Sequence, residues 1–323
     1  MFIVWARFNR RAELLAQRFG ASLHYVYHGR KGHPSQAPMR YLVQAWRTWS
    51  LLRRERPDLV FVQNPPIFAV LVVSIYSRCY GAQYVIDSHT GAFRSSKWRW
   101  SVGLHHLLSR GALTTVVHNE SQGRLVERWG CSYAVVGFTG GEYPRGEPYP
   151  LSEKFNVAVI CGFEADEPLD IVFEAAGLLT GVCFYITGDA RRINRHLLRK
   201  MPGNIRLTGH LSYERYVGLL RGVGAVIDLV DDEHTLLMGG FEAVALGIPL
   251  IVSDWPLLRD YFSRGTIYVP NTAEGVCDGI RRVQQEGIAL RQDVLLLKKL
   301  LHGEWIRKAG ELQRLLRENM QET

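Results

Sequence analysis

DDEHTLLMGGFEAVALGIPLIVSD, residues 231–254, carries the clearest structural signal in this chain. Gly239 and Gly240 precede a helix-like run that contains Glu242, and Gly247 opens a Gly-Ile-Pro turn before an apolar strand. Glycines at the start of a helix let the backbone approach a ligand, and the N–H groups and the helix dipole there suit a phosphate. A carboxylate one turn into the helix can accept hydrogen bonds from ribose hydroxyls. This stretch therefore predicts a site for a phosphate and a ribose.

Strand-like and helix-like segments alternate on the N-terminal side of this stretch, which favours parallel, doubly wound sheets. In the first half the sequence predicts strands at 2–7, 23–28, 59–63, 82–87, 113–118 and 133–138, and helices at 11–19, 39–54 and 66–80. In the second half it predicts strands at 155–163, 183–188, 205–211, 225–230, 248–254 and 267–270, with helices at 168–179, 213–222, around Glu242 and from 273 onward.

The alternation is interrupted once, at residues 139–152, where glycine and proline are frequent and periodicity is lost. We therefore expect an α/β protein of two Rossmann-like domains facing a cleft. The predicted boundaries are 1–145 for an N-terminal domain and 152–304 for a C-terminal domain. Residues 305–323 are predicted to form a helix that returns to the first domain. Ligands of such sheets bind outside the carboxyl ends of the strands.

Positive charge is confined to the first half of the chain. Residues 1–150 hold 19 Lys and Arg against 8 Asp and Glu, a net charge of +11, whereas residues 151–323 hold 20 against 23, a net charge of −3. Trp98 and Trp100 lie among basic residues in RSSKWRW, residues 94–100. This charge favours an anionic partner: a nucleic acid, a phosphorylated substrate or an anionic membrane surface.

The N-terminal sequence MFIVWARFNRR does not resemble a secretory signal, and the longest apolar run, 67–76, is about half of what a bilayer needs. No CxxC pair or zinc-like Cys/His spacing occurs. We therefore expect a cytoplasmic protein, with peripheral association at the inner face of the membrane as a further hypothesis.

Residues 155–270 resemble the donor domain of family 4 glycosyltransferases of the GT-B fold. The resemblance rests on FEAVALGIPLIVSD, on NIRLTGHLSYERYVGLLRGVGAVIDL upstream and on CFYITGD before it, in the family's order. It implies a glycosyltransferase that uses a nucleotide-sugar donor and needs no metal or other cofactor. The resemblance also implies that 1–145 is the acceptor-binding domain and 152–304 the donor-binding domain. On the family's pattern, the implied donor-binding residues are Gly162, Phe163, Gly188, Arg191, His210, His234, Gly239, Gly240 and Glu242.

Three shorter segments, VQNPP at 62–66, IDSHTGAF at 86–93 and GFEADEPLDIVFEAA at 162–176, are similar to chitobiosyldiphosphodolichol β-mannosyltransferases. This similarity implies an acceptor that is a glycan or is linked to a lipid. Nucleic acid is not expected as a partner.

The chain also departs from the family 4 pattern. His234 stands eight positions before Glu242, where the family has a second glutamate, and Gly162-Phe163-Glu164 replaces the family's Arg and Lys. The diphosphate charge must then be met by other cations, for which Arg191, Arg192 and Arg10 are candidates.

Asp87 and His89 follow a buried strand and are the candidate catalytic residues, with Asp87 preferred as the base and His89 second. Thr90 and Arg10 are candidates for contact with the acceptor or a phosphate. The sequence leaves open a retaining or an inverting outcome. It also leaves open two other functions of the same fold, a non-catalytic partner subunit and a nucleotide-sugar epimerase.

Overall fold

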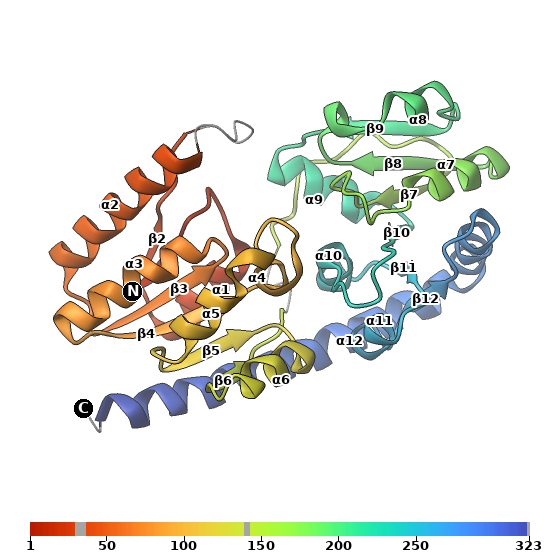
Figure 1. Ribbon diagram of the computed structural model, residues 1–323. Helices are drawn as coiled ribbons and strands as arrows, with labels where there is room; N and C mark the ends of the chain where they lie inside the picture. The colour runs from red at the N-terminus through yellow and green to blue at the C-terminus, as the bar shows by residue number, and fades with distance from the viewer. Residues whose placement is uncertain (30–36, 139–142, 322–323) are drawn as a thin grey trace. The chain divides into compact units, whose positions relative to one another are not determined.

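Two six-stranded parallel sheets, each covered by helices, form the chain (Figure 1). The computed structural model describes residues 1–29, 37–138 and 143–321. The chain divides into one unit of Met1–Phe138 with Glu304–Thr323 and a second unit of Thr139–Gly303. The predicted fold class, α/β with two doubly wound Rossmann-like domains, is confirmed.

The first sheet has the strand order β2-β1-β3-β4-β5-β6, with every neighbouring pair parallel. Its strands coincide with the six predicted apolar runs, because a parallel sheet buries both faces and selects continuous apolar sequence. The strands are β1 Phe2–Val4, β2 Leu23–Tyr25, β3 Leu59–Asn64, β4 Gln83–Ser88, β5 Thr114–Val117 and β6 Tyr133–Val135.

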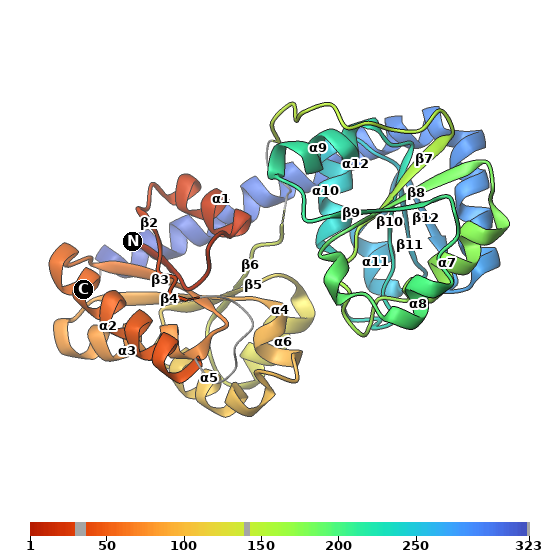
Figure 2. The ribbon, with the colours of Figure 1, turned by 90° about the horizontal axis from the view of Figure 1, so that it is seen from above.

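Helices cover both faces of the first sheet (Figure 2). One face packs against α2, α3 and α5, and the other against α1 and the end of the last helix. Helix α1 begins after Asn9, whose side chain accepts a hydrogen bond from the Ala12 N–H, and ends at Gly20 in the left-handed conformation. The helices are α1 Arg10–Phe19, α2 Ala37–Glu55, α3 Ile67–Tyr80, α4 Thr90–Arg94, α5 Val102–Ser109 and α6 Glu120–Arg128, with a 3-10 turn η2 at Arg99–Ser101.

The second sheet has the order β12-β11-β10-β7-β8-β9 and is also parallel throughout. Its strands are β7 Phe155–Val159, β8 Val182–Thr187, β9 Ile205–Gly209, β10 Ala225–Asp228, β11 Leu250–Ser253 and β12 Thr266–Val269. Its helices are α7 Leu169–Leu178, η3 Ala190–Arg192, α8 Arg195–Arg199, α9 Tyr213–Gly222, α10 Met238–Leu246 and α11 Pro256–Tyr261.

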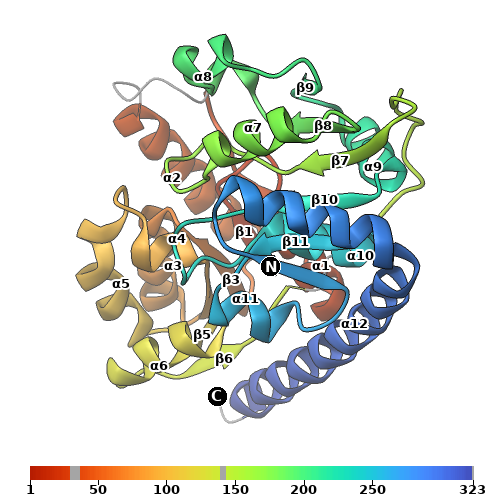
Figure 3. The ribbon, with the colours of Figure 1, turned by 90° about the vertical axis from the view of Figure 1, so that its right-hand side faces the viewer.

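Helix α12 runs from Ala273 to Gln321 and contributes to both units. Its first turns pack on β11 and β12 in the second unit (Figure 3). An added Cβ at Gly279 in these turns would meet Val269 and Ile251. Its last turns place Ala309, Leu312 and Leu316 in the core of the first unit. The segment predicted to return to the first domain is thus the continuation of a helix that begins 32 residues earlier than position 305.

Residues 143–152, which the sequence suggested as part of a linker, pack against α9. The Glu147 N–H donates to the carbonyl of Glu214 at 2.9 Å, and the Arg221 guanidinium donates to the carbonyls of Tyr143 and Pro144. The segment therefore belongs to the second unit, which starts at Thr139 rather than at 152. Residues 139–142 of the predicted linker lie outside the described part of the chain.

Among the helices that the structure describes, none combines the length and the apolar composition required to span a membrane.

Candidate functional site

The predicted site residues lie at the carboxyl ends of the strands of their own sheets, apart from Arg10 at the start of α1. In the second unit they follow β7, β8, β9 and β10, and in the first unit they lie at the end of β4 or directly after it. The strand order reverses between β7 and β10 in the second sheet and between β1 and β3 in the first. Each sheet therefore has a topological switch point at its carboxyl end. Ligands of doubly wound folds bind at such edges.

In the first unit, Asp87 is a fully buried carboxylate near the end of β4. The Nε of Arg11, itself 3% exposed, donates to its Oδ1 at 2.9 Å, and the Nη1 of Arg11 donates to the carbonyl of Gly137 at 2.8 Å. Burial alone would raise the pKa of Asp87, but the Arg11 guanidinium and His89 outweigh burial and hold the pKa well below its usual value. Asp87 is therefore ionised and turned away from solvent.

His89 and His118 lie beside this carboxylate. The Nε2 of His89 is 3.3 Å from Oδ2 of Asp87, an ion-pair distance without the geometry of a good hydrogen bond. The rings of His89 and His118 are tilted against each other with centroids 4.7 Å apart. Burial lowers the pKa of His118 far below its usual value, and Arg11 and His89 lower it further, so His118 is neutral at neutral pH. His89 is the most exposed of the three, with 21% of its side chain accessible.

The other predicted residues of the first unit are held by neighbours. Thr90 is the first residue of α4 and accepts a hydrogen bond from Gln122 at 2.8 Å. Arg10 forms an ion pair with Glu13 at 3.0 Å near the surface. Sequence reasoning named Arg10 and missed Arg11. The signal that could have found it is the buried face of α1, which Arg11 shares with Leu15 four residues later.

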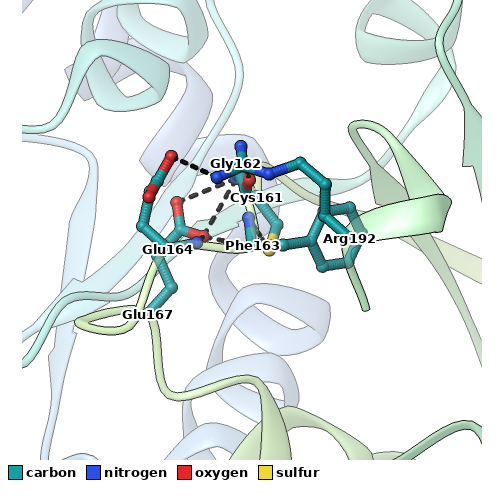
Figure 4. Close-up of polar contacts among 6 residues, drawn as sticks. All are labelled: Cys161, Gly162, Phe163, Glu164, Glu167 and Arg192. Atoms are coloured by element: carbon teal, nitrogen blue, oxygen red, sulfur yellow. Dashed lines mark hydrogen bonds and ion pairs between the residues drawn. The ribbon is translucent and has the colours of Figure 1, made fainter. Parts of the chain in front are cut away.

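In the second unit, the loop after β7 is filled by the protein's own carboxylate (Figure 4). Glu167 accepts hydrogen bonds from the N–H groups of Gly162 and Glu164, at 2.9 Å each for the nearer oxygen, and from the thiol of Cys161. Gly162 and Phe163 were predicted to bind the donor. The structure instead gives the Gly162 N–H an internal partner, and the Phe163 N–H points to the Cys161 sulfur.

The basic residues after β8 are also paired. Arg192 donates to the carbonyl of Gly162 at 2.6 Å and to Glu164 at 2.7 Å (Figure 4). Arg191 forms a two-bond ion pair with Asp189, yet its side chain is 89% exposed. Gly188 has φ +105°, and a Cβ there would lie 2.2 Å from the carbonyl oxygen of Cys161. Gly188 thus permits the loops after β7 and β8 to approach each other.

The two glycines before Glu242 have a packing role that the sequence did not predict. Their N–H groups, in the first turn of α10, face the buried carboxylate of Asp228 at the end of β10. A Cβ on Gly239 would lie 2.5 Å from Oδ2 of Asp228, and one on Gly240 would lie 2.6 Å from the Phe262 ring. The expected phosphate position at this helix start is therefore occupied by Asp228. Burial, and then the charges of Glu167 and Glu242, raise the pKa of Asp228 well above its usual value.

Glu242 is a half-buried carboxylate held by a short hydrogen bond from the hydroxyl of Tyr216 on α9. Burial raises the pKa of Glu242, and the Tyr216 hydrogen bond offsets part of the rise. Burial also raises the pKa of Tyr216 well above its usual value, so its hydroxyl remains a donor. One carboxylate oxygen of Glu242 is thus fixed by the protein.

His210 and His234 are exposed side chains on loops at the same edge of the sheet. His234 follows β10 by several residues and its Nε2 lies 3.5 Å from Glu233. His210 directly follows β9. Nearby, hydrogen bonds from Arg191 lower the pKa of Asp189.

Residues 170–294 match a family model described as glycosyl transferase-like. Sucrose-phosphate synthase from Thermosynechococcus elongatus superposes with a TM-score of 0.70 at 12% identity, over 94% of this chain and 84% of that one. The Anabaena protein HepE in complex with UDP-glucose does so with a TM-score of 0.66 at 12% identity, over 97% and 91%. The chain has the GT-B fold. No curated protein matches it in sequence.

A protein from Listeria monocytogenes assigned as a UDP-N-acetylglucosamine 2-epimerase shares the same GT-B fold. Its TM-score is 0.64 at 12% identity, over 96% of this chain and 87% of that one. The fold alone therefore does not separate transfer from epimerisation, whereas the family match over 170–294 describes transfer. Neither the family model nor the solved structures test the resemblances to family 4 and to the mannosyltransferases, so these two resemblances stay predictions.

We expect Asp87→Leu to lower the free energy of unfolding by about 3–5 kcal/mol, because it leaves the Arg11 guanidinium buried without a counter-charge. Urea unfolding measures the loss. Arg10→Met is the matched control, since its ion pair with Glu13 is partly exposed and is worth at most about 1 kcal/mol. The double variant Asp87→Leu, Arg11→Met should lose less than the sum of the single variants. Additive losses would contradict a coupled pair.

Proposed function

We propose that the chain transfers a sugar from a nucleotide-diphosphate sugar to an acceptor, with the donor on the second unit and the acceptor on the first. The observation that carries the proposal is the glycosyl transferase-like match over residues 170–294, a range that includes Glu242 on α10. The HepE relative, whose structure contains UDP-glucose, makes a uridine donor the first to test.

On the donor side, Glu242 would accept hydrogen bonds from the ribose hydroxyls. Tyr216 occupies one of its oxygens and leaves acceptor capacity on the other. Arg191 would bind the diphosphate. Its exposed ion pair with Asp189 contributes little free energy, so a phosphate can replace Asp189 as its partner. The N–H groups of Gly162 and Glu164 are already bonded to Glu167, so this loop offers the diphosphate fewer hydrogen bonds than the sequence predicts.

On the acceptor side, the geometry reverses the order of the two catalytic candidates. Asp87 is fully buried between Arg11 and His89, so it cannot reach an acceptor hydroxyl, whereas His89 is partly exposed. We assign His89 as the base and Asp87 as the positioning residue that holds its ring. Because Nε2 of His89 faces Asp87, Nδ1 is the nitrogen turned away from the carboxylate and available to a proton.

In this mechanism the acceptor oxygen attacks the anomeric carbon while its proton passes to His89. The bond from that carbon to the diphosphate oxygen breaks, and the nucleoside diphosphate leaves with the electron pair. A single displacement of this kind inverts the anomeric configuration. Comparing donor and product anomers by NMR tests it.

We expect Glu242→Ala to weaken UDP binding about tenfold to 150-fold, since a hydrogen bond to a charged acceptor contributes roughly 1.5–3 kcal/mol. Calorimetry with UDP measures the change. Glu233→Ala is the matched control, because Glu233 is an exposed carboxylate in the preceding loop. Unchanged affinity for Glu242→Ala would make Glu242 a packing residue only.

His89→Ala should lower kcat by about 100-fold or more, while the Kd for UDP stays within about twofold, because the base acts on the acceptor. Release of UDP from UDP-sugars, with and without acceptor, measures turnover. An epimerase would interconvert the donor without any acceptor, and a non-catalytic subunit would bind UDP without turnover. Full activity of His89→Ala would place the base elsewhere.

We further propose that the first unit docks on an anionic membrane and takes a lipid-linked acceptor. Met39, Leu42 and Trp46 lie along one face of α2 and are 65–68% exposed, and Trp100 is 63% exposed. The Phe68 ring lies between α2 and Trp100. Its centroid is 5.0 Å from that of Tyr41 on α2 and 6.0 Å from that of Trp100. We call Met39, Leu42, Trp46 and Trp100 the apolar docking surface.

The charge around the apolar docking surface supports an anionic bilayer as its partner. Helix α2 has no acidic residue before Glu55, and no acid occurs between Asp87 and Glu120. Lys97 and Arg99 are exposed beside Trp100. Trp98, which the sequence grouped with Trp100, is 8% exposed and packs against Tyr41 and Phe68 instead. Membrane contact is therefore proposed for Trp100 alone of this pair.

Replacing both Lys97 and Arg99 by Glu should weaken binding to anionic vesicles by at least about thirtyfold, since each basic residue near the surface contributes about 1 kcal/mol. Leu42→Ser with Trp46→Ser should weaken it as well, and Ile288→Ser, an 82% exposed apolar residue of the second unit, should not. Co-sedimentation with phosphatidylglycerol and phosphatidylcholine vesicles across a salt series measures this. Equal binding to neutral vesicles, or no binding at low salt, would point to a soluble acceptor.

A further inference from the structure

Two histidines and a carboxylate gather at the carboxyl edge of the first sheet. Asp87 belongs to the end of β4, His89 precedes α4, and His118 follows β5. One ligand atom from each of these three residues lies within 4.8 Å of the other two. Three metal-type ligands thus converge from neighbouring strand ends, a position where parallel sheets place functional groups.

We propose that Asp87, His89 and His118 bind a single divalent transition-metal ion of the zinc class. Two imidazole nitrogens and one carboxylate oxygen suit zinc, cobalt or nickel ions, whereas magnesium and calcium prefer oxygen ligands alone. Three protein ligands leave a further coordination position for water. His89, the most exposed of the three, marks the side from which the ion reaches the site.

The orientation of Asp87 favours this ligand set. Arg11 holds Oδ1, while Oδ2 is buried and makes no hydrogen bond to the residues that the structure describes. Nε2 of His89 is also buried, 3.3 Å from that oxygen, and makes no hydrogen bond of good geometry within the described part of the chain. A buried carboxylate oxygen without a hydrogen bond is costly, and an ion would satisfy it.

The backbone around the two histidines is tied together. The His118 N–H donates to Oε1 of Gln122, and Nε2 of Gln122 donates to Thr90, the residue after His89. This bridge fixes the segment that carries His118 to the segment that carries His89. The bridge thereby holds the backbone positions from which the two histidine side chains extend.

Two features limit the affinity. Ligand atoms around a tetrahedral zinc ion are roughly 3.3 Å apart, so the spacing of up to 4.8 Å must contract through rotation of the histidine side chains. The guanidinium of Arg11 beside Asp87 also repels a cation. Both features favour a reversible site over a permanently filled one.

A bound ion would stop His89 from acting as a base, a consequence that rests on the proposed transferase function. A neutral imidazole has two ring nitrogens. When one binds a metal, the other carries the ring proton, so no lone pair remains for an acceptor hydroxyl. Zinc would therefore act as an inhibitor at this site and not as a participant in sugar transfer.

The test is calorimetric titration of ZnCl₂ into chelator-treated protein, with a chromophoric chelator as competitor. We expect one ion per chain, an affinity at least tenfold lower in His118→Gln and in His89→Gln, and no competition from MgCl₂. His234→Gln is the matched control, because His234 is an exposed histidine 3.5 Å from a glutamate. Circular dichroism verifies that each variant is folded. Absence of binding to the unchanged chain would overturn the proposal. So would an affinity in both ligand variants equal to that of the unchanged chain.

A second measurement uses the unchanged chain and does not depend on either variant folding. Zinc at the concentration that saturates the site should slow the modification of His89 by diethyl pyrocarbonate, measured by mass spectrometry, and should leave His234 unaffected. Equal modification of His89 with and without zinc would overturn the proposal. Because both measurements are independent of sugar transfer, a failure of the proposed transferase activity would be seen separately as zinc binding without turnover.

Discussion

A buried carboxylate needs a partner, and in the first unit that requirement joins three parts of the fold. Asp87 at the end of β4 is fully enclosed, and Arg11 brings α1 and the carbonyl of Gly137 to it. An unpaired charge at this depth would cost several kcal/mol. The pair therefore fixes where α1 meets the carboxyl end of β4, directly before His89.

The same requirement shapes the second unit with different partners. Glu167 takes the N–H groups of the loop after β7, and Asp228 takes those at the start of α10. In both places the chain supplies its own carboxyl group where a glycine-rich turn would otherwise receive a phosphate. Glu242 is arranged differently, since Tyr216 fixes one oxygen and leaves the carboxylate half-buried. Glu242 therefore keeps a free acceptor oxygen for the nucleoside, whereas the glycine N–H groups are already occupied.

The strands and the longer helices could be predicted from the sequence, because both sheets are parallel and buried on both faces. Runs such as Val60–Val62 and Leu250–Val252 are continuous and apolar, and such runs do not depend on distant contacts to be recognised. The short helices α4, α5, α6, α8 and α11 were not predicted, since each is defined by capping and tertiary packing rather than by periodicity. At the sites, the sequence places residues at strand ends but does not give their partners. Arg11 with Asp87 is separated by 76 positions, and Glu167 with Gly162 depends on the path of a loop.

Because of helix α12, the first unit is formed by two segments that are separate in the sequence. A fragment that ended near position 303 would contain every strand of both sheets, yet it would lack Ala309, Leu312 and Leu316. The apolar face formed by Phe2, Leu15 and Phe61 would then be open to water, and exposed faces of this kind promote aggregation. Residues 304–321 therefore complete the hydrophobic core of the first unit, and tags or truncations at the C terminus affect the N-terminal half of the chain.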